Sequence, residues 1–113
     1  MAMAPAIIGS TWTAVEINGA PAPTQLSTFR VAEDNVTASG KGGCNSWSAP
    51  VSIDGGSIGI GTIRATNMAC LGPGMKQERE YFATLGVTRS LEVADGELRF
   101  LDANGTIVIR FAV

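Results

Sequence analysis

The stretch WSAPVSIDGGSIGIGTI, Trp47–Ile63, decides the fold, because two short apolar runs flank the turn Asp54-Gly55-Gly56. A turn of Asp and Gly between alternating apolar runs is typical of an antiparallel hairpin. Two cysteine-bearing motifs bracket this hairpin, Gly43-Cys44-Asn45 before it and Thr66-Asn67-Met68-Ala69-Cys70 after it. A segment with helical periodicity follows at once. This order predicts a hairpin with a cysteine beyond each end, followed by a helix.

The same alternation recurs along the rest of the chain, and we expect eight strands joined mainly by turns of Asp, Asn and Gly. They are Thr11–Ile17, Leu26–Ala32, Val36–Gly40, Trp47–Ile53, Ser57–Ile63, Val87–Val93, Glu97–Leu101 and Thr106–Phe111. Trp12, Val15 and Ile17 are the expected core residues of the first strand. Asn18-Gly19 is a typical hairpin signal, but the prolines of 20–23 lack the N–H that a paired strand uses, so a loop is predicted there.

One segment has helical periodicity. Met75–Leu85 repeats its large residues at helical spacing, with Pro73 suited to the first turn and Gly86 to the C-terminal cap. The face expected to be buried contains Met75, Phe82 and Leu85, and the exposed face contains Lys76, Arg79 and Glu80. The expected fold is therefore mainly β, an antiparallel meander with one packed helix.

The two cysteines are expected in loops at one end of the sheet. The third and fifth strands of a meander point the same way, so Cys44 and Cys70 follow strands that end together. A disulfide is geometrically plausible and would stabilise the fold by roughly 3–4 kcal/mol. Two small apolar core thiols are the alternative. Two cysteines without a histidine fall short of the ligand set of a zinc site.

The chain has no histidine, which excludes Ser-His-Asp and Cys-His sites. Carboxylates remain for acid–base chemistry, but five of the ten fall in predicted turns, where acidic residues make local hydrogen bonds. These are Glu33, Asp34, Asp54, Asp95 and Asp102. Asn45 and Thr66 are expected to hold the backbone by side-chain hydrogen bonds, with a ligand-facing role as the alternative. We predict no catalytic residue, no cofactor and no metal ligand.

The chain has 113 residues and fits one domain. Residues 1–10 are expected to be an N-terminal tail or an expression remnant, and residues 11–113 the domain. The net charge is −2 and the eight basic residues are spread singly, which argues against nucleic acid as a partner. No apolar stretch is long enough to span a membrane. The first eight residues are too short and uncharged for a complete signal peptide.

Three motifs in order give a resemblance over nearly the whole chain. Gly43-Cys44-Asn45, then the motif from Thr66 to Cys70, then Met75-Lys76-Gln77-Glu78, resemble the META domain of HslJ-like bacterial proteins. The residues that carry this family motif are Gly43, Cys44, Asn45, Thr66, Met68, Ala69, Cys70 and Glu78. The resemblance implies a small barrel or half-barrel with one helix packed on it.

The resemblance also implies a compartment and a class of function. Such domains occur in envelope proteins and lipoproteins linked to stress, so a periplasmic, outer-membrane or secreted location is expected, with possible tethering to the membrane in a longer protein. An oxidising compartment favours the disulfide between Cys44 and Cys70. We expect a non-enzymatic module that binds a protein, a peptide or a small apolar ligand. The alternative is a protease inhibitor that presents a rigid loop, from Pro21–Pro23 or Leu71–Gly74.

Overall fold

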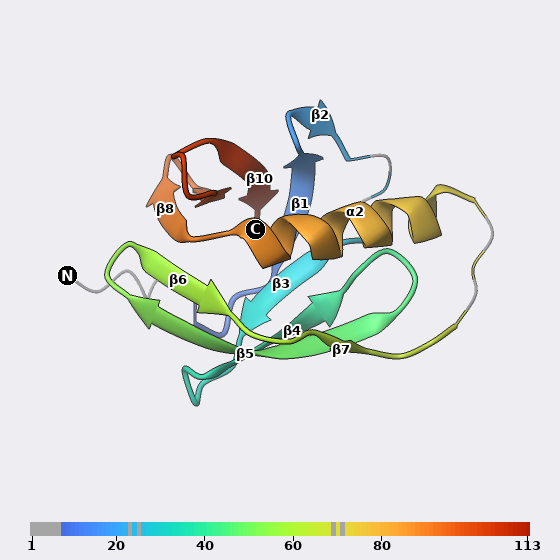
Figure 1. Ribbon diagram of the computed structural model, residues 1–113, viewed down its shortest axis with the longest axis horizontal. Coiled ribbons are helices and arrows are strands. Elements are labelled where there is room, and N and C mark those ends of the chain that lie inside the picture. Colours follow the sequence, from blue (N-terminus) through green and yellow to red (C-terminus); the bar gives the residue numbers. More distant parts are fainter. Residues whose placement is uncertain (1–7, 23, 25, 69, 71) are drawn as a thin grey trace.

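The computed structural model describes residues 8–22, 24, 26–68, 70 and 72–113, and shows a closed antiparallel barrel with a packed helix (Figure 1). The barrel strands lie in the order β10–β9–β8–β6–β5–β4–β3–β1, and β1 pairs with β10 to close the ring. Their bounds are β1 Trp12–Ile17, β3 Thr28–Val31, β4 Thr37–Lys41, β5 Ser46–Asp54, β6 Ser57–Ile60, β8 Ser90–Ala94, β9 Glu97–Leu101 and β10 Ile107–Ala112. Nearly all neighbours are consecutive in the chain, so the predicted meander and barrel are confirmed.

The barrel interior is filled by aromatic side chains that the alternation of the strands points inward. Phe29, Phe100 and Phe111 are fully buried, and the ring of Phe100 lies 5.0 Å from Phe29 and 4.9 Å from Phe111. Both pairs are edge-to-face, an arrangement that aromatic quadrupoles favour. The interior is therefore a packed core.

The helix α2, Pro73–Val87, lies across the barrel between β1 and β10 on one side and β4 and β5 on the other (Figure 1). Tyr81 and Leu85 are fully buried, and the Tyr81 ring packs 6.2 Å from that of Trp47. Among the described residues, no helix is both long and apolar enough to cross a membrane.

The predicted helix faces are confirmed in part. Leu85 is buried, whereas Met75 and Phe82 are only half-buried. Three residues are exposed as predicted: Lys76, Arg79 and Glu80. Gly86 does not end the helix, which continues to Val87, so the strand expected from Val87 begins only at Ser90.

The predicted loop after β1 is wrong, because Ala20–Pro21 forms a short strand, β2, paired with β1. Asn18 and Gly19 have φ values of 54° and 81°, as a tight two-residue hairpin turn requires. Pro21 lies opposite Glu16, and the N–H of Ala22 donates to Val15 O at 3.0 Å. The N–H group beside Pro21, that of Ala22, makes this hydrogen bond to β1, so the missing N–H of the proline is tolerated.

A bulge in β1 and a break between β6 and β7 explain two further differences from the sequence pattern. The register of β1 against β10 shifts between Ala14 and Glu16, which leaves Val15 39% exposed instead of in the core. A bulge inserts one unpaired residue and inverts the inside–outside alternation after it. The strand expected over Ser57–Ile63 is likewise interrupted after Ile60, and the chain pairs with β5 again as β7, Arg64–Ala65.

Candidate functional site

The two cysteines form a disulfide that ties the β4–β5 turn to the segment before α2. Cys44 lies in this turn and Cys70 lies between β7 and α2, with their Cα atoms 6.0 Å apart. The predicted pairing is confirmed. It joins the two motifs that the sequence places on either side of the hairpin.

Beside the disulfide, the carboxylate of Glu78 on α2 is buried against the same turn. Its Oε1 accepts hydrogen bonds from the main-chain N–H groups of Cys44 at 3.0 Å and Asn45 at 2.6 Å, and its Oε2 accepts from Asn45 Nδ2 at 2.8 Å. Glu78 is only 5% exposed. One carboxylate therefore satisfies three donors of the turn.

Asn45 connects this carboxylate to the second cysteine motif. Its Oδ1 accepts from Met68 N at 2.6 Å and from Thr66 Oγ1 at 2.9 Å, and its Nδ2 also donates to Met68 O at 3.3 Å. Asn45 is 3% exposed. The structural role predicted for Asn45 and Thr66 agrees with these contacts, although Asn45 holds the neighbouring segment more than its own turn. The motif residue Ala69 lies outside the described residues.

Two glycines allow the turn to approach the helix closely. A Cβ atom added to Gly74 would lie 2.8 Å from the main-chain oxygen of Gly43, and one added to Gly42 would lie 2.7 Å from Glu78 Cγ. Gly43 itself has φ of 149°, a conformation that favours glycine. Gly43 and Gly74 lie where the backbones of the turn and of α2 are nearly in contact, and Gly42 lies against the side chains of Glu78 and Phe82.

Gln77 makes a second polar attachment that the sequence did not reveal. Its side chain is 2% exposed, accepts from Thr24 N at 2.9 Å and donates to Ser27 Oγ at 2.7 Å. Ser27 Oγ in turn donates to Gly42 O at 2.6 Å. The signal available in the sequence was two adjacent polar residues, Gln77 and Glu78, within a helix that had to pack on a sheet.

The environment of Glu78 favours its charged form. Burial by itself raises the pKa of the carboxyl group, but hydrogen bonds from the Asn45 side chain and from the N–H groups of Asn45 and Cys44 outweigh it. The net result is a pKa below the ordinary 4.5. At neutral pH Glu78 is therefore an ionised acceptor, which suits it to hold the turn and not to donate a proton.

Other carboxylates also serve local structure. Asp34 accepts from the N–H groups of Val36 and Thr37, at 2.9 and 3.0 Å, and Asp102 accepts from that of Thr106 at 3.0 Å. In the described part of the chain, no three or more Cys, Asp or Glu residues gather as a metal site would require. The candidate site is thus an anchoring cluster of Gly43, Cys44, Asn45, Thr66, Met68, Cys70 and Glu78.

In the described residues, an eight-stranded closed barrel with a helix held to it by a disulfide and a buried carboxylate defines the structural class. The sequence profile of the META domain matches residues 5–113, and the chain belongs to the META domain family. The match begins at residue 5, before the domain boundary expected at residue 11, and Ile8 forms a parallel bridge to Val31 of β3.

Two solved structures share the fold. An NMR structure of a protein has a TM-score of 0.74 at 16% identity, covering 99% of this chain and 95% of its own. The NMR structure of a protein from Burkholderia xenovorans has a TM-score of 0.70 at 21% identity, covering 96% and 83%. None of the curated proteins matches the chain significantly. These likenesses support the fold alone.

Proposed function

We propose that this chain is a non-enzymatic interaction domain that works in an oxidising, extracytoplasmic compartment. The observation that carries the proposal is the disulfide between Cys44 and Cys70, which is consistent with such a location. The ionised Glu78 adds support, because its acceptors are taken up by the β4–β5 turn and its lowered pKa does not suit a general acid.

The anchoring cluster supports a binding role through rigidity. It fixes α2 and the segment around Met68 to the barrel, so that the surface around them is held in one arrangement. A pre-ordered surface loses less conformational entropy when a partner binds. We infer a partner that is a protein, a peptide or a small apolar ligand.

The compartment is tested by trapping thiols in the cells that make the protein. Acid quenching followed by a mass-tagged maleimide should add no tag, because both cysteines are oxidised. The reduced protein is the positive control and should gain two tags. Two tags on the protein taken directly from cells would contradict the proposed compartment.

The binding role is tested by retention of partners from envelope extract. The oxidised protein and a Cys44→Ser/Cys70→Ser variant should both remain folded, and the oxidised protein should retain a defined partner more strongly. Retention of nothing specific by either protein would contradict the binding role.

The protease inhibitor remains the alternative predicted from the sequence. Of its two candidate loops, Pro21 is paired within β2, while Pro23 and Leu71 lie outside the described residues. Titration against serine and cysteine proteases tests this alternative.

A further inference from the structure

The register of the sheet brings together cationic side chains that lie far apart in the sequence. Arg30 on β3 is opposite Ser39 on β4, Ser39 is opposite Ser48 on β5, and Ser48 is opposite Arg64 on β7. Strands in a sheet are about 4.8 Å apart, so the two arginines are about 14 Å apart across this row. Lys41, two residues beyond Ser39, lies in the next row.

These side chains point away from the core. Their neighbours in the strands, Phe29, Val31, Ala38, Trp47 and Ala49, are all buried. Alternate residues of a strand point to opposite faces, so the arginines and serines of the row lie on the outer surface of the barrel. We call Arg30, Ser39, Lys41, Ser48 and Arg64 the cationic face.

The charges of the cationic face are not neutralised locally. Among the described residues, the ion pairs all involve Arg99 or Arg110, and none involves a cation of this face. The ammonium of Lys41 donates instead to Ser46 Oγ at 3.0 Å. At the margin of the face, Asp34 is occupied with the N–H groups of its own turn.

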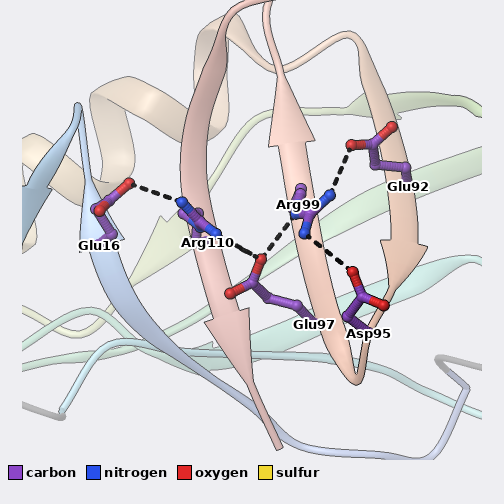
Figure 2. Close-up of polar contacts among 6 residues, drawn as sticks. All are labelled: Glu16, Glu92, Asp95, Glu97, Arg99 and Arg110. Atoms are coloured by element: carbon purple, nitrogen blue, oxygen red, sulfur yellow. Dashed lines mark hydrogen bonds and ion pairs between the residues drawn. The ribbon is translucent and has the colours of Figure 1, made fainter.

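On the wall formed by β1, β10, β9 and β8, by contrast, carboxylates outnumber the arginines and pair with them. Figure 2 shows Arg99 and Arg110 enclosed by four carboxylates, with Glu97 accepting from both arginines. The carboxylates are those of Glu16, Glu92, Asp95 and Glu97. Charge is therefore segregated between two walls of a barrel whose total charge is only −2.

An exposed apolar side chain borders the cationic face. Leu26 is 54% exposed and lines a hollow of about 230 Å³ together with Lys41, Gly43 and Cys44. Met68, also 54% exposed, lies on the segment that Asn45 holds beside this hollow. Cations next to exposed large apolar residues on one surface are typical of a protein that rests on a lipid interface.

We propose that the cationic face and Leu26 dock this domain onto an anionic lipid bilayer. Three separated cations on the outer surface of one wall can reach the phosphates of several headgroups, and the serine hydroxyls between the arginines supply donors to phosphate oxygens. Leu26 enters the boundary between headgroups and acyl chains. This inference goes beyond the proposed function, because a lipid surface is a different class of partner from the protein, peptide or small apolar ligand inferred above. It can fail while the thiol test still supports the proposed compartment.

The test is cosedimentation with vesicles of phosphatidylcholine containing 30% phosphatidylglycerol, compared with phosphatidylcholine alone. The protein should bind the anionic vesicles and release them at high salt. Arg30→Ser/Arg64→Ser should weaken partitioning roughly 25-fold, since each cation near the surface contributes about fivefold. Lys76→Ser/Arg79→Ser, which removes the same charge from exposed positions of α2, should change it less than about twofold.

A second pair of variants tests the apolar contact. Leu26→Gln should weaken binding to the vesicles without changing the salt dependence of binding. Val36→Gln, at another exposed apolar position, should leave binding unchanged. Circular dichroism and thermal unfolding confirm that each variant is folded. Failure of the native protein to bind, or equal losses in the two double variants, would overturn the proposal. Binding that soluble polyphosphate abolishes and that Leu26→Gln leaves unchanged would show a polyanion site instead, and would also overturn it.

Discussion

Replacement of Glu78 by glutamine should weaken the attachment of α2 to the barrel. In the variant the remaining oxygen can still accept from the N–H groups of Cys44 and Asn45, but as a neutral group. The new amide NH2 group faces Asn45 Nδ2, which is also a donor. The amide of Asn45 cannot flip to relieve this contact, because its Oδ1 accepts hydrogen bonds from Met68 N and Thr66 Oγ1. One charged hydrogen bond becomes a contact between donors. Because hydrogen bonds to charged groups contribute about 1.5–3 kcal/mol, we expect the free energy of unfolding to fall by about 2–3 kcal/mol.

The assay is urea unfolding of the oxidised protein at several pH values. The folded pKa of Glu78 lies below 4.5, so its contribution is fully present above that pH and is lost as the pH falls through the folded pKa. The difference in free energy of unfolding between the native protein and Glu78→Gln should therefore become smaller below about pH 4.5. The control Glu80→Gln, at an exposed helix position, should stay within about 0.5 kcal/mol of the native protein. A difference under 0.5 kcal/mol at pH 7, or one that is constant from pH 7 to pH 3, would refute the reasoning.

Three further predictions follow from the same contacts. Thiol titration of the denatured, unreduced protein should find no free thiol, and two reactive thiols would contradict the bridge. Cys44→Ser/Cys70→Ser should lower the free energy of unfolding by about 3 kcal/mol, because the linked positions are 26 residues apart in the sequence. Burial raises the pKa of Tyr81, the sole tyrosine, well above 10.0, so absorbance near 295 nm should report its ionisation only when the protein unfolds. Gly74→Ala should lower the free energy of unfolding by more than about 2 kcal/mol by overpacking. Gly86→Ala, where the added Cβ meets open space, should raise it by about 0.5–1 kcal/mol. Similar denaturation midpoints for the two variants would contradict the close approach of helix and turn.

Local pattern was sufficient for much of the fold, and it made the disulfide geometrically plausible without excluding two core thiols. Turn residues between alternating apolar runs located most strands, and the even number of steps between two strands placed Cys44 and Cys70 at one end. The pattern failed where a bulge, a strand break or a tight hairpin interrupted it. Val15 looked like a core residue because the inserted residue in β1 cannot be seen in the sequence.

The sequence by itself determined the class of the protein: a mainly β META domain with one helix, a single possible cysteine pair and no histidine for catalysis. These properties depend on composition, on short-range periodicity and on motifs that each span a few residues. Only the tertiary structure decided that Glu78 is a buried acceptor and that Arg30, Lys41 and Arg64 share one face. The physical reason is register: cross-strand neighbours and the seat of a helix on a sheet are fixed by long-range packing, so side chains many residues apart become neighbours in ways that no local pattern encodes.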